Sequence, residues 1–250
     1  MSRRRPRILV VNDDGIHGPG LLPLIAVLSG FAEVSAVVPE RERSADSHSL
    51  TLRRPLRVKQ VRPGLFLADG SPADCARLGV LEIVKRPDLA VSGVNDGYNL
   101  GSDVVYSGTV AGAMEAAILG VPALSVSRGL ARRLDFGPAA ELAGRIASEI
   151  LRRGLPPGVS LNLNVPPLPA SRLRGVKVAI LGRRIYGKKV TARRDPYGAP
   201  YYWLAGRYVS GFSDKGTDVS AVRAGFASLT PLHVDNTHRP TLSLLKKWEL

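Results

Sequence analysis

The chain has 250 residues, of which 44% are hydrophobic and 22% are charged, a composition that indicates a globular protein and excludes a largely disordered one. Its 35 Lys and Arg residues against 21 Asp and Glu residues give a net charge of +14. This charge favours anionic partners, but no zinc-finger spacing, RNP signature or basic heptad helix indicates a dedicated nucleic-acid site. The single cysteine, Cys75, excludes an internal disulfide.

The hydropathy pattern indicates neither a signal peptide nor a membrane span. The basic residues 1–7 are followed by only four apolar residues before two acids intervene, which is too short for a signal sequence. No later stretch approaches the length of a membrane helix. We therefore expect a cytoplasmic protein with no membrane partner.

The first two thirds of the chain alternate short apolar runs with helical patterns. Strands are expected at residues 8–11, 33–38, 56–60, 64–68, 87–91, 123–127 and 161–165, and helices at 21–28, 71–83, 109–119 and 139–152. Such alternation predicts right-handed crossovers and a doubly wound, mostly parallel α/β sheet in residues 1–167.

The pattern changes after Pro167, and residues 168–250 form a second part. Residues 171–194 contain nine basic residues and no acid, and a Pro/Gly turn at 195–200 then leads to Tyr201, Tyr202 and Trp203. This predicts a long β-hairpin at about 180–206, either an oligomer contact or an arm folded back on its own domain. A helix at 217–223, a strand at 225–230 that returns to the main sheet, and a short helix at 242–250 follow.

Two adjacent aspartates, Asp13 and Asp14, directly follow the first strand. Adjacent carboxylates on an extended backbone point to opposite sides, but at the exit of a strand a glycine-rich turn lets both face one cation. Asp-Asp-Gly is also common as a plain turn. The neighbouring loops therefore decide between a turn and a metal site.

Two later loops offer further oxygen ligands. They follow the second strand and the strand at 87–91, and both should open at the same sheet edge as the aspartates. Their polar residues are Ser44, Asp46, Ser47, His48 and Ser49 in the first, and Asn95, Asp96 and Asn99 in the second. Oxygen ligands of this kind suit Mg²⁺, Mn²⁺ or Ca²⁺ and argue against a structural zinc site.

A phosphate site is predicted where Ser107, Gly108 and Thr109 begin a helix of small residues. Its backbone N–H groups and dipole favour an anion, and the two hydroxyls add donors. The same residues also read as a plain helix cap. There is no Walker A sequence, and the glycines between Gly15 and Gly20 lack the dinucleotide spacing, so neither an ATPase nor a dehydrogenase is expected.

Four long motifs, in the same order, resemble the SurE family of stationary-phase survival proteins. They read ILVVNDDGIHGPGL, VVPERERSADSHSLT, GSPADCARLG and SGVNDGYNLGSDVVYSGTVAGAMEAAILGVPALSVS. The resemblance implies a divalent-metal-dependent 5'(3')-nucleotidase, a phosphomonoesterase (acid phosphatase) that hydrolyses nucleoside monophosphates and has some activity on short polyphosphate. It also implies a Rossmann-like core and a C-terminal part whose protruding hairpin and exchanged end build dimers or tetramers.

The resemblance also implies roles for single residues. The metal ligands would be Asp13, Asp14, Ser44 and Asn95, holding one Mg²⁺ or Mn²⁺ per subunit. The catalytic residues would be Asp13, Asp14, Asn99 and Ser107, either aspartate serving as general base or acid. The phosphate-binding residues would be Asn12, Ser107, Gly108 and Thr109. Asp96 stands where many members carry Arg, which we expect to leave the local charge more acidic.

A non-catalytic nucleotide-binding or nucleic-acid-binding protein is the alternative. It accounts for the net charge of +14 equally well. It gives no reason for acids and amides to converge on one sheet edge. The sequence therefore favours the enzyme, with nucleoside monophosphates and a second copy of the chain as partners.

Overall fold

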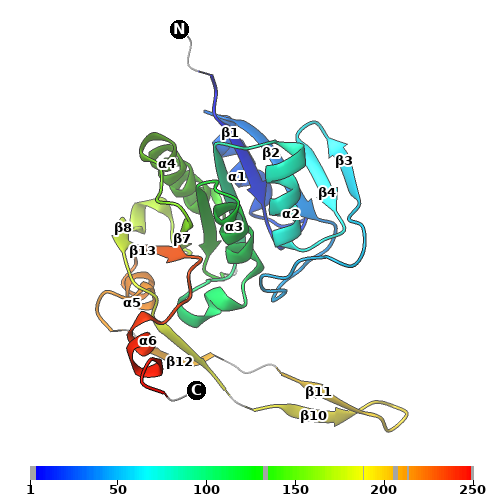
Figure 1. The fold of residues 1–250 in the computed structure, drawn as a ribbon, viewed down its shortest axis with the longest axis vertical. Helices are drawn as coiled ribbons and strands as arrows, with labels where there is room; N and C mark the ends of the chain where they lie inside the picture. The colour runs from blue at the N-terminus through cyan, green and yellow to red at the C-terminus, as the bar shows by residue number, and fades with distance from the viewer. Residues whose placement is uncertain (1–3, 132–134, 188, 205–207, 213, 249–250) are drawn as a thin grey trace.

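The computed structural model describes residues 4–131, 135–187, 189–204, 208–212 and 214–248. A nine-stranded sheet with the order β3-β4-β2-β1-β5-β6-β7-β13-β8 forms the body, and helices cover both faces (Figure 1). Its strands are β1 (Arg7–Val11), β2 (Glu33–Pro39), β3 (Val58–Arg62), β4 (Leu65–Ala68), β5 (Leu89–Asp96), β6 (Ala123–Arg128), β7 (Val159–Val165), β8 (Val176–Val178) and β13 (Ala227–His233). The neighbours β4, β2, β1, β5, β6 and β7 run parallel, which confirms the predicted doubly wound α/β fold.

The central strands are buried on both faces because helices pack on each side. Alternate side chains of β1 go to opposite layers: Ile8 and Val10 face one core, and Leu9 and Val11 face the other. The first core is covered by α1 (Leu21–Ser29) and α4 (Gly137–Arg153), the second by α2 (Pro72–Leu78) and α3 (Gly108–Ile118). Near-continuous apolar strands are what a sheet with two covered faces requires.

The order of the strands creates a switch point between β1 and β5. From β1 the chain first builds outward on one side through β2 and β4, and then returns to place β5 on the other side of β1. The loops that follow β1 and β5 therefore diverge and leave a crevice at the carboxyl ends of these strands.

Several predicted boundaries differ from the structure. The last predicted helix, at 242–250, spans residues 239–245, and the strand predicted at 225–230 spans residues 227–233. The predicted helix at 71–83 is α-helical only over α2, whose capping box joins Ser71 and Asp74, and it continues as a π-helical turn, η1 (Gly79–Ile83). The strand predicted at 87–91 ends too early, because residues 92–96, expected in the loop after it, extend β5. Although their composition is polar, they pair with β6, with an irregularity between Ser92 and Asn95.

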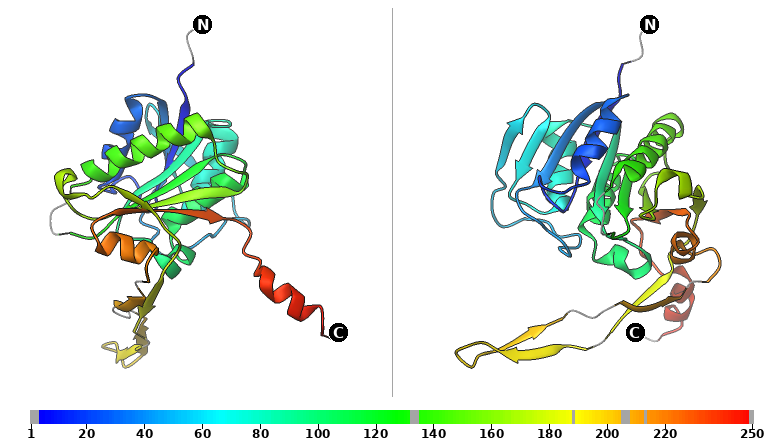
Figure 2. Two further views of the ribbon diagram at one scale, coloured as in Figure 1. Left: turned by 90° about the vertical axis from the view of Figure 1, so that its left-hand side faces the viewer. Right: turned by 180° about the vertical axis from the view of Figure 1, so that it is seen from behind.

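The second part of the chain contributes to the sheet and also leaves it. Strand β13 returns to the main sheet antiparallel to β7, as predicted, and pairs with β8. Helix α5 (Asp218–Arg223) precedes it. A long arm carries β9 (Arg183–Tyr186) paired with β12 (Tyr208–Phe212), and β10 (Thr191–Arg194) paired with β11 (Pro200–Trp203) (Figure 2).

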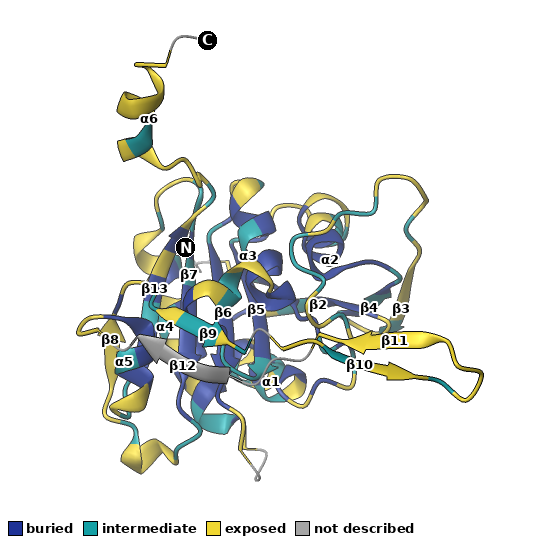
Figure 3. Ribbon diagram, turned by 90° about the horizontal axis from the view of Figure 1, so that it is seen from below, coloured by how far each residue is buried: buried dark blue, intermediate teal, exposed yellow. Residues whose placement is uncertain are grey.

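The arm and the last helix, α6 (Arg239–Leu245), project from the body. Figure 3 shows that β10, β11 and most of α6 are exposed, in contrast to the buried central strands. The protruding hairpin is thus confirmed. Residues 188, 205 and 206 of the predicted hairpin and residues 249–250 of the predicted helix lie outside the described residues.

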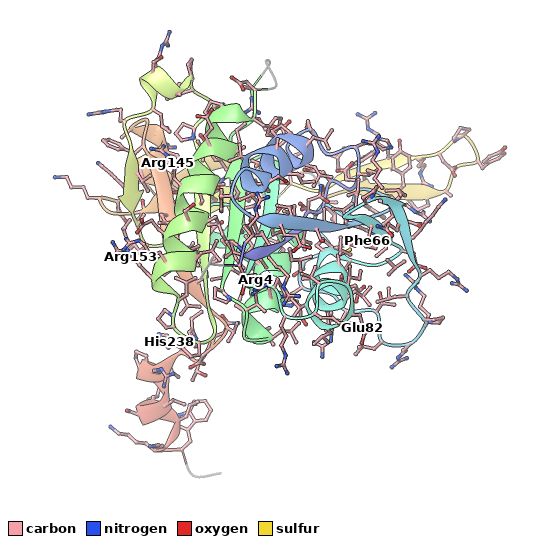
Figure 4. All side chains as sticks on the ribbon, turned by 90° about the horizontal axis from the view of Figure 1, so that it is seen from above. Arg4, Phe66, Glu82, Arg145, Arg153 and His238 are labelled. Atoms are coloured by element: carbon pink, nitrogen blue, oxygen red, sulfur yellow. The ribbon has the colours of Figure 1, made fainter. Side chains whose placement is uncertain are left out.

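The basic side chains of α4 lie on the face of the helix that is open to solvent. Arg145 and Arg153 are exposed on this helix, whose other face packs on the sheet (Figure 4). Within the described part of the chain, no helix combines the length and apolar character needed to cross a bilayer.

Candidate active site

Three loops meet in one pocket at the carboxyl edge of the sheet, as the strand order requires. They follow β1, β2 and β5, and the N-terminus of α3 closes the pocket beside them. The cavity has a volume of about 610 Å³. Its lining includes most of the predicted site, namely Asp13, Asp14, Ser44, Asn95, Asn99 and Ser107. The predicted convergence of the three loops is therefore present.

The two aspartates have different surroundings. Asp13 is 4% exposed, and its Oδ1 accepts a hydrogen bond of 2.5 Å from the Thr109 hydroxyl. Burial raises its pKa, although that hydrogen bond acts in the opposite direction. Asp14 is half-buried, and its Oδ2 is buried without a hydrogen-bond partner among the described residues. An orphaned carboxylate oxygen is costly to bury and marks a place for a cation or donor.

Like charges gather around Asp14. Burial, followed by the carboxylates of Asp13, Glu42 and Asp96, raises the pKa of Asp14 to about 7. Glu42 lines the same pocket and was not predicted as a site residue. Glu42 could have been found from its position, because it lies two residues before Ser44 in a polar loop that follows a strand. The pocket floor is consequently acidic.

Two glycines let neighbouring backbone approach the aspartates. A Cβ at Gly18 would lie 2.6 Å from the Asp14 Cβ, and a Cβ at Gly108 would lie 2.9 Å from the Asp13 Cβ. Both distances are too short for a side chain to fit without displacement. Gly108 in particular allows the first turn of α3 to lie directly against Asp13, which brings the expected phosphate site next to the aspartates.

The N-terminus of α3 has the predicted cap. Ser107 is the N-cap residue, and its Oγ accepts a hydrogen bond of 3.1 Å from the Val110 N–H. Ser107 also lines the pocket, so the positive end of the α3 dipole lies beside the acidic floor. The Thr109 hydroxyl donates to Asp13 and holds that carboxylate in place, while the predicted contact of Thr109 with phosphate stays a prediction.

Three asparagines have distinct roles in the structure. The Asn12 amide donates to the Gly15 carbonyl (2.8 Å) and its Oδ1 accepts from the Gly15 N–H, so Asn12 fixes the turn that carries the aspartates. Its phosphate contact stays a prediction. Asn95 donates to the Gly97 carbonyl at 2.9 Å, which leaves its Oδ1 as a ligand atom. Asn99 donates to the Ser127 hydroxyl at 2.8 Å. Each side chain is thus held by a near neighbour.

The loop after β2 places Ser44 in the pocket and turns other candidates away from it. Ser44 donates to Glu42 Oε1 at 2.8 Å. Ser47 donates to the Val105 carbonyl, and His48 contacts the buried Glu115 on α3 at 2.8 Å. Asp46 pairs with Arg43 at 3.6 Å. Of the polar residues predicted in this loop, Ser44 is the one that lines this pocket.

Asp96 adds a negative charge near Asp14, as expected from sequence, but it also has a cationic partner. It faces Arg128 across the register of β5 and β6, and the two side chains form an ion pair at 2.9 Å. Arg128 is almost fully buried and also lies over the Phe136 ring at 4.7 Å. Arg128 offsets part of this charge, while Asp96 still acts on Asp14 as one of the carboxylates that raise its pKa.

The fold and the pocket define an α/β protein with an acidic, oxygen-rich site beside a helix N-terminus. Comparison with known proteins identifies similar chains. The profile of the family described as "Survival protein SurE" matches residues 8–188. Proteins named 5'-nucleotidase SurE are 45% identical over 245 residues in Geobacter metallireducens (97% of each chain) and 46% identical over 250 residues in Chloroflexus aggregans (97% of this chain, 98% of the other).

A solved structure agrees with the sequence comparison. The crystal structure of the SurE protein from Aquifex aeolicus superposes with a TM-score of 0.86 at 39% identity and covers 96% of this chain and 98% of that chain. The chain belongs to the SurE family.

Proposed function

We propose that this protein is a 5'-nucleotidase, a metal-dependent phosphomonoesterase that hydrolyses nucleoside monophosphates to nucleoside and phosphate. Relatives that carry this name align with nearly the whole chain. The observation that carries the proposal here is the unpartnered Asp14 carboxylate beside Asp13, facing the N-terminus of α3. Nucleoside 3'-monophosphates and short polyphosphate offer the same phosphoryl group and are further substrate classes.

A divalent cation, Mg²⁺ or Mn²⁺, fits the donor set at the pocket floor. Asp13, Asp14, Ser44 and Asn95 would hold it through carboxylate, hydroxyl and amide oxygens, which are hard ligands. Among the described residues there is no group of three or more His, Cys, Asp or Glu side chains arranged for a metal. Burial is the largest cause of the raised Asp14 pKa, and a cation would relieve the carboxylate repulsion that adds to it.

In the reaction, water attacks phosphorus, the ester P–O bond breaks, and the nucleoside oxygen takes a proton. The bound ion would supply Lewis acidity toward a phosphoryl oxygen and an acidified water. The Ser107 hydroxyl and the positive end of the α3 dipole would stabilise the remaining phosphoryl oxygens. Thr109 holds Asp13 in position, and Asn99, held at Ser127, adds an amide at the pocket wall. Positioning and electrostatics thus carry the catalysis.

The exposed aromatic arm supports assembly with further copies of the chain. Tyr202 and Trp203 on β11 are 63% and 61% exposed, and α6 exposes Leu242 and Leu244. Large apolar side chains in contact with water are typical of surfaces that a partner covers. We include a dimer or tetramer in the proposal, built by the arm and by exchange of the C-terminal segment. A cytoplasmic location stays a prediction.

Phosphate release distinguishes this proposal from a non-catalytic binding protein. Purified protein is assayed with 5'-nucleotides, 3'-nucleotides and polyphosphate, in Mg²⁺ or Mn²⁺ and again with EDTA. Release that EDTA abolishes and added metal restores supports the enzyme. Salt-sensitive nucleotide binding without release of phosphate would support the binding protein and refute the proposal.

A further inference from the structure

The pocket has a second region of different chemistry beyond its acidic floor. Tyr98, Tyr106, Tyr186 and Leu204 line the same cavity as the aspartates. Tyr106 is 64% exposed, Tyr186 is 41% exposed and Leu204 is 82% exposed. The wall is therefore a cluster of aromatic and apolar surface open to solvent, whereas the floor collects carboxylates. A ligand that fills the whole cavity needs an anionic end and an apolar, planar end.

Tyr186 comes from the root of the arm, and a buried carboxylate fixes that root to the active-site loop. Asp218 is fully buried, and it accepts hydrogen bonds from the Gly101 N–H at 2.8 Å and the Gly182 N–H at 2.7 Å. Gly101 belongs to the segment between Asn99 and Ser107, and Gly182 directly precedes β9. The arm root is thus held against the loop that carries two of the predicted catalytic residues.

A second contact orients the Tyr186 side chain. Its hydroxyl donates to the Asp103 carboxylate at 2.8 Å, and Asp103 also pairs with Arg184. Asp103 lies in η2 (Gly101–Val105), immediately before Tyr106 and Ser107. Arg184 lies over the Tyr186 ring, 5.5 Å from its centroid, and Tyr186 is still 41% exposed, so a ligand in the cavity can reach this side chain. Figure 3 shows β9 lying across the sheet edge from which the site loops emerge.

The position of the phosphate limits where the rest of the substrate can go. Ser107 and the first turn of α3 receive the phosphoryl group in the proposed function, and Tyr106 is the residue next to Ser107. A group esterified to that phosphate therefore extends along the wall that Tyr106 and Tyr186 form. Aromatic side chains stack on nucleobases with about 1–3 kcal/mol per base, and stacking discriminates little between bases because each has a π-face.

We infer that Tyr106, Tyr186 and Leu204 form a stacking site for the nucleobase, so that the arm supplies part of the nucleotide pocket. This inference rests on the proposed function. It adds the residues that would distinguish nucleotides from other phosphomonoesters by binding the base. The site selects for a planar base but makes little distinction between purines and pyrimidines. Residues on the arm would then serve both substrate binding and assembly.

The test compares a substrate with a base and one without. For wild type and Tyr186→Ala, kcat/KM is measured with adenosine 5'-monophosphate, cytidine 5'-monophosphate and glycerol phosphate. We expect the ratio of nucleotide to glycerol phosphate to fall by about 5- to 100-fold, chiefly through KM, as loss of one stacking contact implies. Tyr186→Phe retains the ring but lacks the hydroxyl, and it should keep most of the ratio. Tyr197→Ala, at the 95% exposed tip of the arm, should not change it.

A binding measurement gives a readout independent of turnover. Titration calorimetry with adenosine should show weaker binding to Tyr186→Ala and Tyr106→Ala than to wild type, with light scattering to compare their assembly. If a folded Tyr186→Ala lost kcat/KM equally for the nucleotides and for glycerol phosphate, or lost none for either, the stacking site would be refuted. The proposed phosphatase activity would still stand. If the wild type released no phosphate from any substrate in Mn²⁺, the proposed function itself would fail.

Discussion

Glu115 on α3 is a buried carboxylate whose removal should loosen the loop that carries Ser44. It is 2% exposed and lies 2.6 Å from Arg77 and 2.8 Å from His48. Because an ionised carboxylate only accepts hydrogen bonds, both partners must donate to it. The loop that bears His48 also contains Ala45 and Ser47 with positive φ of 64° and 55°, a conformation that needs such anchors to persist.

The magnitude follows from the two hydrogen bonds. Glu115→Gln keeps the shape of the side chain but replaces one acceptor oxygen by an NH₂ group, so one donor loses its partner and the other faces a neutral acceptor. Hydrogen bonds to charged groups contribute about 1.5–3 kcal/mol each, and we expect a loss of about 2–4 kcal/mol of folding free energy. In a chain of this size that lowers Tm by about 5–15 °C.

Thermal unfolding followed by circular dichroism at pH 7.5 measures this loss. The matched control is Glu149→Gln on α4, where Glu149 contacts Arg152 and Arg153 at 2.6 Å but all three side chains are exposed. Exposed ion pairs contribute little, so the control should unfold close to the wild-type temperature. Equal Tm values for Glu115→Gln and the control would refute the reasoning.

The same network predicts a pH dependence. Burial alone would raise the pKa of Glu115, but hydrogen bonds from His48 and Arg77 hold it below its ordinary value of 4.5. A carboxyl whose pKa is lowered by folding stabilises the protein above its unfolded pKa, and this contribution is lost as pH falls through the folded pKa. The difference in Tm between wild type and Glu115→Gln should therefore shrink below about pH 4.5. A constant difference would contradict the assignment.

Three further changes test the site and the arm. Gly108→Ala should lower kcat/KM at least about tenfold and destabilise the fold by about 1–3 kcal/mol, because the new Cβ would lie 2.9 Å from the Asp13 Cβ and 3.0 Å from Pro72; unchanged kinetics would show that α3 can move. Asp14→Asn in EDTA should raise Tm by about 2–6 °C, the effect of relieving about 1–2 kcal/mol of repulsion, and a fall would contradict the repulsion. Replacing residues 190–204 by a Gly-Gly link should reduce the mass measured by light scattering, and an unchanged mass would refute the role of the arm in assembly.

The position of the site could be predicted from sequence because it depends on topology. Asp13, Ser44 and Asn95 each lie at or just beyond the end of a strand, and in a doubly wound sheet such ends share an edge. The helix cap at Ser107 could also be predicted, because a Ser before a run of small residues indicates a helix start from the local sequence alone.

The remaining contacts depend on register and long-range packing. The Asp96–Arg128 pair needs the register of β5 against β6, and the Glu115–His48 contact joins residues far apart in sequence. Sequence patterns do not specify either of these. The sequence predicts Tyr186 only as part of a hairpin. Its place in the pocket follows from the hydrogen bonds of Asp218 and Asp103, which only the folded chain shows.

Replacement of Asp13 by Asn tests the central claim most directly. Asp13 is buried, in contact with Thr109, and its carboxylate lines the pocket floor. Purified Asp13→Asn and wild type are compared in Mn²⁺ by phosphate release from adenosine 5'-monophosphate, with Glu149→Gln as the control and circular dichroism as the check of folding. We predict a fall in turnover of at least about two orders of magnitude, as for removal of a key electrostatic group. A folded Asp13→Asn that hydrolyses the nucleotide at nearly the wild-type rate would contradict the assignment of the metal site.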